Sequence, residues 1–263
     1  MEPVGWQLVI KLVGGRVLCP GPAHRRALAR TVLVFGEDRG LLAFGAADTH
    51  LHVLTTGNRE TAGRLARSLE LALHSALGVA TAFRPAEITP INDQYHLVNA
   101  FRYVQRNAQR HCLADLAASE ASSLHDLLGM RQLAPWLGDR VRRFLPRTDR
   151  QYLLRTLGLP DLGVKGEPTP GLLADAAAAS VSHSTLTGSE PMVVCARTAA
   201  VSMVSGRWKP VEVSRALGIS VRGVYRLAEQ EADPNFIRAI ERHLAWREAL
   251  RSAPDPLLDP DPG

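Results

Sequence analysis

Cysteine is scarce in this sequence, and long uninterrupted apolar runs are missing from it. The three cysteines, Cys19, Cys112 and Cys195, lie far apart. They make neither a CxxC metal motif nor a disulfide framework, so we expect a protein of a reducing compartment such as the cytoplasm. No stretch of about 18 apolar residues occurs, which argues against a membrane span. The N-terminal apolar run is short and contains Lys11, so it indicates a strand rather than a signal peptide.

What the sequence does have is length, apolar content and positive charge. Its 263 residues, of which 46% are hydrophobic, can bury a sizeable core and fit one large domain or two small ones. The net charge of +5 favours a polyanionic partner such as nucleic acid.

Strand and helix patterns alternate over the first half of the chain. Asn58 is a predicted helix N-cap, and Leu65, Leu69 and Leu73 recur after it on one helical face. The expected elements are a strand, a helix, two short strands, a helix, an extended segment and a helix, over residues 6–13, 23–35, 41–56, 59–77, 81–91 and 93–110. This order predicts an α+β fold with a ferredoxin-like core, an antiparallel sheet with helices.

The remainder of the chain divides by composition. After the core, expected over 1–130, residues 131–186 read as a helical connector with a Gly/Pro-rich linker. Residues 187–250 are expected to form a small all-α domain. The Pro/Asp-rich tail, 251–263, is expected to be disordered.

Two histidines, His50 and His52, flank Leu51 on a predicted strand. Residues i and i+2 of a strand point to the same face, so both imidazoles can reach one metal ion while Leu51 packs behind them. Imidazole is a common ligand of divalent metals. Taken alone, the pair is also what a strand with two unrelated histidines would show.

A tyrosine, Tyr103, lies four residues before Asn107 on the predicted helix 93–110, so both project from one helical face. A tyrosine hydroxyl can attack a phosphodiester when a metal or strong donors stabilise the developing charge. Asn107 could add an oxygen ligand to that metal. Tyr95 is a competing nucleophile on the same helix. The alternative for Tyr103 is a half-buried aromatic of the core.

In combination, these motifs resemble those of a known enzyme family. His50-Leu51-His52 is similar to the His-hydrophobic-His motif of HUH nucleases, and Tyr103-Val104-Gln105-Arg106-Asn107 is similar to the nucleophile helix of single-tyrosine transposases. The REP-associated tyrosine transposases match best, because a later stretch, 122–129, also resembles theirs. The resemblance covers roughly the first half of the chain, and family members usually have Pro-Asn where this sequence has Asp48-Thr49.

The resemblance implies an HUH core that cuts and joins single-stranded or hairpin DNA. Tyr103 would form a 5′-phosphotyrosine and leave a 3′-hydroxyl, while His50, His52 and Asn107 would hold Mg²⁺ or Mn²⁺. The recurrent arginines of the same helix would hold the DNA backbone; these are Arg102, Arg106 and Arg110. The resemblance also implies a bacterial protein of the cytoplasm that associates with the nucleoid. Related enzymes often form homodimers, so a homodimer is an expected partner.

The segment 210–229 resembles a helix-turn-helix. Gly218 would make the turn and Ser220 would cap the second helix. Arg222, Tyr225 and Arg226 would then face duplex DNA. The surrounding helices are similar to the DNA-binding domain of DnaA-type initiators, and the alternative is a plain helical hairpin for protein contacts. His183 and His243 fit no ligand spacing and are expected on the surface.

Two other functions stay open on the sequence. One is a sequence-specific DNA-binding regulator with an inactive or domesticated transposase core. The other is a structural or partner-binding protein whose basic charge has no role. Binding through phosphate contacts weakens as the salt concentration rises, so DNA binding that is insensitive to salt would favour this second alternative.

Overall fold

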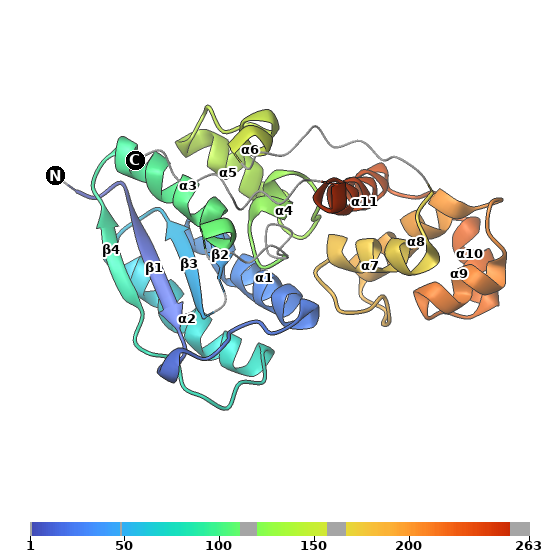
Figure 1. Cartoon of the computed structure of the whole chain (residues 1–263), viewed down its shortest axis with the longest axis horizontal. Helices are drawn as coiled ribbons and strands as arrows, with labels where there is room; N and C mark the ends of the chain where they lie inside the picture. Colours follow the sequence, from blue (N-terminus) through green and yellow to red (C-terminus); the bar gives the residue numbers. More distant parts are fainter. Residues whose placement is uncertain (1, 48, 111–119, 157–166, 253–263) are drawn as a thin grey trace.

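The computed structural model describes residues 2–47, 49–110, 120–156 and 167–252. Strands and helices alternate in the first part of the chain, and the later part is helical (Figure 1). The first part contains β1 (Gly5–Lys11), η1 (Val13–Gly15), α1 (Pro22–Gly36), η2 (Glu37–Arg39), β2 (Leu41–Ala46), β3 (His50–Thr55), α2 (Arg59–Ala76), β4 (Glu87–Ile91) and α3 (Gln94–Arg110). The later part contains α4 (Leu124–Leu127), α5 (Trp136–Phe144), α6 (Arg150–Thr156), α7 (Pro170–Ser180), α8 (Pro191–Val204), α9 (Pro210–Leu217), α10 (Val221–Ala228) and α11 (Pro234–Ser252).

The strands form one antiparallel four-stranded sheet in the order β2-β3-β1-β4. With α1 between β1 and β2 and α2 between β3 and β4, this is the β-α-β-β-α-β order of the ferredoxin-like fold. The predicted α+β class is therefore confirmed, as is the strand pair predicted within 41–56. None of the helices in the described ranges has the length and apolar character needed to span a membrane.

Helices cover both faces of the sheet. Figure 1 shows α1 and α2 on one face of the sheet. The helix α2 packs against β1, whose Leu8 and Ile10 are fully buried. The helix α3 packs on the other face, against β2 and β3. Because they are covered from both sides, β2 and β3 are buried along almost their whole length. This two-sided cover places α3 directly over the side chains of β3.

The helix α2 begins and packs as its sequence indicates. The Asn58 side chain accepts a 2.8 Å hydrogen bond from the backbone N–H of Thr61, which satisfies one of the unpaired donors of the first turn. Leu65, Leu69 and Leu73 are all buried. The predicted cap and the predicted apolar face are both confirmed.

The helical part of the chain belongs to two hydrophobic cores. The helices α4, α5 and α6 extend the core of the sheet, whereas α7 to α10 form a second core. The long helix α11 joins them, since Trp246 packs in the first core and Ile240 in the second. The helix α11 contacts both α7 and α8, and Figure 1 shows it next to α7, on the side of the helical part nearest α4.

This division differs from the one that the sequence suggests. The predicted connector, 131–186, is shared between the two cores, because α7 and Leu186 pack with the second one. The sequence of α7 is apolar on almost every side, so the helix has to be surrounded rather than laid on a surface. Most of the predicted linker, at 157–166, and the tail at 253–263 lie outside the described residues.

Four charged side chains connect the sheet to the helical part. Arg26 of α1 contacts Glu120 and also Asp175 of α7, with an Nη2–Oδ1 distance of 2.5 Å to the latter. Arg247 of α11 contacts the same two carboxylates and lies 3.1 Å from Glu120 Oε1. Burial opposes ionisation of Glu120, but the hydrogen bond and charge of Arg26 outweigh it, so the pKa of this carboxyl is lowered.

His243 is buried in α11, so the expectation that it lies on the surface is wrong. Its ring lies 5.2 Å from that of His125, centroid to centroid, and His125 also contacts Trp246. Burial holds the pKa of both imidazoles well below the ordinary range, so both are neutral. Sequence spacing could not predict this because the burial arises only where α11 crosses the first core. His183 is half-buried.

Candidate active site on the sheet face under helix α3

His50 and His52 project from β3 with their imidazoles side by side. The ring centroids are 4.7 Å apart and the ring planes are at 88°. His50 Nδ1 lies 3.3 Å from Thr49 Oγ1, and His52 Nδ1 lies 3.2 Å from Gln7 Nε2. Leu51 is fully buried on the opposite face, as strand alternation requires. The two imidazoles are therefore placed where one ion could contact both.

Tyr103 of α3 lies over this histidine pair. Its hydroxyl oxygen is 3.5 Å from His52 Nε2, and the two rings meet edge to face with centroids 5.0 Å apart. The contact joins residues 51 positions apart in the sequence. Tyr95, two helical turns earlier, is 78% exposed. The fold thus brings Tyr103, rather than Tyr95, beside the histidines.

A glycine on β2 determines how closely α3 approaches the sheet. Gly45 is the cross-strand partner of His52. A Cβ atom at this position would lie 2.6 Å from the backbone carbonyl oxygen of Val104, the residue after Tyr103. Only glycine allows the helix backbone to come this near, so Gly45 fixes the separation between the tyrosine and the histidines.

Asn107 lies one helical turn after Tyr103 and is 1% exposed. Neither its amide oxygen nor its amide nitrogen has a hydrogen-bond partner among the described residues. A buried amide without a partner is unfavourable by about 1 to 3 kcal/mol, which makes it a candidate ligand. No cluster of three or more His, Cys, Asp or Glu side chains suited to a metal ion occurs within the described ranges. The imidazoles of His50 and His52 and the amide oxygen of Asn107 are donor types that divalent cations accept.

A pocket of about 450 Å³ opens beside Tyr103. Its wall is formed by Gln7 of β1 and by residues of α3, among them His96, Asn99, Arg102, Tyr103 and Arg106. His96, Asn99, Tyr103 and Arg106 follow one another at helical spacing, so they form a single polar stripe. The stripe leads along the helix to the tyrosine hydroxyl.

The arginines of α3 have different environments. Arg102 Nε donates a 2.6 Å hydrogen bond to the hydroxyl of Tyr152 on α6, and its guanidinium lies 5.7 Å from the centre of that ring. Arg106 is exposed and lines the pocket. Arg110 is the last residue of α3, and its side chain lies outside the described part of the chain. Two guanidinium groups are therefore available on the pocket side of Tyr103.

The helices α9 and α10 form a tightly joined pair. Gly218 ends α9 in the left-handed conformation, with φ of 65°, and the Ser220 side chain accepts from the backbone N–H of Gly223 at the start of α10. Val224 and Leu227 of α10 are buried. The opposite face of α10 is exposed and carries the three residues predicted to meet duplex DNA, namely Arg222, Tyr225 and Arg226.

Sequence reasoning missed several residues of the site. His96 and Asn99 could have been found from their helical spacing to Tyr103. Gln7 and Tyr152 carry no comparable signal, because each reaches the site only through contacts across about 45 to 50 positions of sequence. The spacing of residues within one strand or helix does not reveal which distant strand or helix it packs against.

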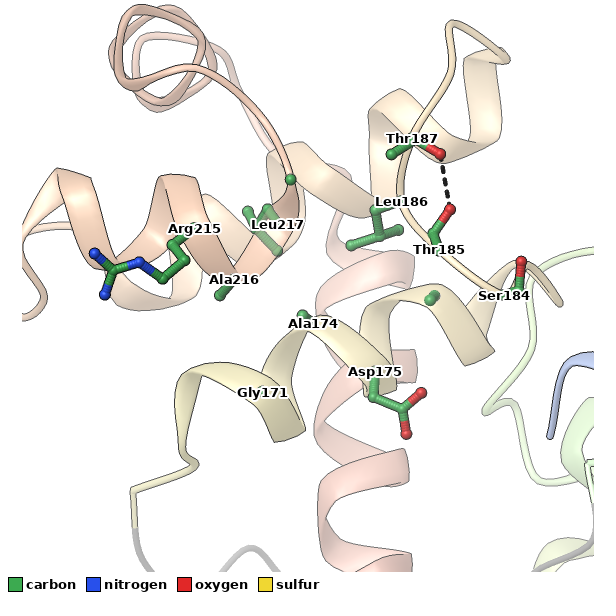
Figure 2. Close-up of a pocket in the computed structure, with 12 residues that line it drawn as sticks. Gly171, Ala174, Asp175, Ser184, Thr185, Leu186, Thr187, Arg215, Ala216 and Leu217 are labelled. Atoms are coloured by element: carbon green, nitrogen blue, oxygen red, sulfur yellow. Dashed lines mark hydrogen bonds between the residues drawn. The ribbon is translucent and has the colours of Figure 1, made fainter. Parts of the chain in front are cut away.

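A second pocket, of about 330 Å³, lies in the helical part between α7, the segment after it and α9 (Figure 2). Thr185 and Thr187 hydrogen-bond to each other at its rim, with 2.7 Å between their hydroxyl oxygens. Figure 2 shows that the side chains of Asp175 and Arg215 point away from each other. Asp175 already binds Arg26 and Arg247. The charges around this pocket therefore do not converge on one point.

No protein-family model matches this chain, and a search of curated proteins finds no match. A solved structure of a REP-associated tyrosine transposase bound to a REP hairpin is distantly similar. Its TM-score is 0.40 at 15% sequence identity, and the alignment covers 49% of this chain and 81% of that chain.

Proposed function

We propose that the chain is a metal-dependent endonuclease and strand transferase for single-stranded or hairpin DNA, a transposase of the single-tyrosine HUH type. The observation that carries the proposal is the placement of the Tyr103 hydroxyl 3.5 Å from His52, whose ring lies beside that of His50. A nucleophile beside a histidine pair is the arrangement that the sequence motifs predict. The two histidines belong to β3 and the tyrosine belongs to α3, and only the tertiary fold brings these two elements together.

Tyr103 would attack the phosphorus of a DNA phosphodiester. The bond from the phenolic oxygen to phosphorus forms, and the bond from phosphorus to the 3′ oxygen breaks. The proton that leaves the tyrosine is balanced by the one that the 3′ oxygen gains. The product is a 5′-phosphotyrosine and a free 3′-hydroxyl, and a second 3′-hydroxyl can reverse the step and join strands without ATP.

His50, His52 and Asn107 would hold Mg²⁺ or Mn²⁺. The orphaned, buried amide of Asn107 supports this assignment. A divalent ion, when bound, supplies Lewis-acid stabilisation of the charge that develops on the phosphoryl oxygens. Arg102 and Arg106 would hold the flanking DNA backbone at the pocket, with Tyr152 keeping the Arg102 guanidinium in place.

The nuclease proposal predicts a covalent protein–DNA adduct that depends on Tyr103. With labelled hairpin DNA from the flanks of the gene and Mn²⁺, we expect a slow-migrating band on denaturing electrophoresis. Tyr103→Phe removes the nucleophilic oxygen and should abolish the band. Tyr95→Phe is the matched control, because it removes the same oxygen from an exposed tyrosine of the same helix, and it should leave the band unchanged.

The adduct assay also separates the alternatives. A band that survives in Tyr103→Phe assigns the nucleophile to another residue and refutes this site. Tight DNA binding without any band, over a range of substrates and metals, favours the DNA-binding regulator with an inactive core.

We propose that α9 and α10 act as a helix-turn-helix that binds duplex DNA. The exposed arginines of α10 and the capped, glycine-containing turn support this assignment.

The double variant Arg222→Ala, Arg226→Ala should bind duplex DNA more weakly. The slope of the logarithm of the binding constant against the logarithm of the salt concentration should also become shallower by about 2, because each arginine contact with a phosphate releases about one counterion. Arg238→Ala, an exposed arginine of α11, is the control. An unchanged slope would assign α10 to protein contacts instead.

A further inference from the structure

We propose that Gln7 is a positioning residue that selects the tautomer of His52 and thereby decides which chemical group His52 presents to Tyr103. The inference deepens the proposed nuclease function and rests on it. It assigns a role to a residue that lies far from the sequence motifs of the site.

The sheet register brings the two side chains together. Val9 of β1 is the cross-strand partner of His52, and Gln7 is two positions along the same strand. Gln7 and His52 are therefore diagonal neighbours on one face of the sheet, a separation that a long side chain can span. The Gln7 Nε2 to His52 Nδ1 distance of 3.2 Å is within hydrogen-bonding range. His52 is only 5% exposed, so water competes weakly for this contact.

Both ring nitrogens of His52 have assigned neighbours. Nδ1 faces Gln7, and Nε2 faces the Tyr103 hydroxyl at 3.5 Å. A neutral imidazole carries one N–H and one lone pair, so the partner of one nitrogen determines what the other can offer. Gln7 is thus in a position to control, through the ring, the nitrogen that faces Tyr103.

A glutamine amide can satisfy either tautomer. With its NH₂ group toward Nδ1, Gln7 donates a hydrogen bond and forces the proton of His52 onto Nε2. Turned by 180°, the amide has the same shape, and its oxygen accepts from Nδ1–H. The lone pair of His52 then lies on Nε2, toward Tyr103.

The proposed chemistry requires the second arrangement. A nitrogen that bears a proton can neither accept one from a phenol nor donate an electron pair to a divalent cation. We therefore assign the working state to Gln7 with Oε1 toward Nδ1, which is the amide turned by 180° from the orientation in which Nε2 lies 3.2 Å from Nδ1. Outer-shell partners of this kind orient ligating histidines, and their loss weakens metal binding by about 10- to 100-fold.

Nitrogen NMR on protein labelled with ¹⁵N-histidine tests the tautomer directly. At about pH 8, where ordinary imidazoles are neutral, the His52 signals are identified by their loss in His52→Asn. We expect the Nδ1–H form in the unaltered protein with Mg²⁺. Gln7→Glu, which can only accept from Nδ1, should keep that form. Gln7→Leu, which offers no acceptor, should shift His52 toward the Nε2–H form.

Binding of Mn²⁺, followed by electron paramagnetic resonance without DNA, is the second readout. Gln7→Leu should weaken it by about 10- to 100-fold, and Gln7→Glu should restore it. Thermal unfolding checks that each variant is folded, and Gln7→Met replaces Gln7→Leu if the latter does not fold.

The inference is overturned if a folded Gln7→Leu protein keeps both the tautomer and the Mn²⁺ affinity. It is equally overturned if the unaltered protein with Mg²⁺ shows the Nε2–H form. These readouts need no DNA, so they are separable from the adduct assay. A missing adduct alongside the expected tautomer shift refutes the nuclease and leaves the role of Gln7 in place.

Discussion

Arg26→Met is expected to lower the free energy of unfolding by about 3 kcal/mol. Arg26 is 3% exposed and holds Glu120, which is 12% exposed, together with Asp175. Its Nη1 also donates a 3.0 Å hydrogen bond to the backbone oxygen of His183. Removing it leaves Arg247 as the cation that contacts both carboxylates among the described residues, and an uncompensated buried charge costs about 3 to 5 kcal/mol. We place the effect at the lower end because Asp175 is half-exposed and partly solvated.

Urea unfolding followed by circular dichroism measures this change. Because Arg26 connects α1 to α7, and Arg247 connects both carboxylates to α11, the variant should also loosen the link between the two cores. If the transition separates into two, the free energy of the transition at lower urea is the one compared with that of the unaltered protein. Arg64→Met is the control, since Arg64 forms an exposed i,i+4 pair with Glu60 at 3.7 Å, and such pairs contribute about 0.5 kcal/mol or less. A loss below 1 kcal/mol for Arg26→Met would show that the network does not join the cores.

The parts of the fold that could be predicted are those encoded by local periodicity. The cap at Asn58 and the leucines of α2 follow from spacing within one helix. The shared direction of His50 and His52 follows from strand alternation alone. These features do not depend on what the element packs against, so the sequence is sufficient for them.

The parts that could not be predicted depend on partners distant in the sequence. His243 has the sequence context of a surface histidine, and it is buried because α11 lies across the first core. The helix α7 looked like part of a connector, yet it has too little polar surface to stay outside a core. The meeting of the tyrosine and histidine motifs was expected only from their resemblance to a known family, because physically it depends on how closely α3 approaches β2.

Gly45→Ala tests how closely α3 must approach β2. We expect this variant to form the DNA adduct about 100-fold more slowly than the unaltered protein. The added Cβ would lie 2.6 Å from the carbonyl oxygen of Val104, a backbone atom that cannot turn aside. The helix α3 must therefore shift away from the sheet. Because Tyr103 precedes Val104, its hydroxyl moves relative to His52, and a displacement of about 1 Å at a catalytic group costs about 100-fold in rate. Overpacking should also destabilise the fold by about 1 to 3 kcal/mol.

Gly63→Ala is the matched control for this effect, because it adds the same methyl group to a glycine of α2. The nearest atom to a Cβ there is the guanidinium of Arg59 at 3.4 Å, the movable end of a long side chain. Alanine in a helix interior is favoured over glycine by about 0.5 to 1 kcal/mol, so this variant should be more stable and equally active. The two substitutions add the same methyl group, which meets a fixed backbone atom in β2 and the movable end of a side chain in α2. If Gly45→Ala kept full adduct formation, the separation of α3 from the sheet would not determine the reactivity of Tyr103, and the contact between Tyr103 and His52 would lose its place as the basis of the proposed nuclease.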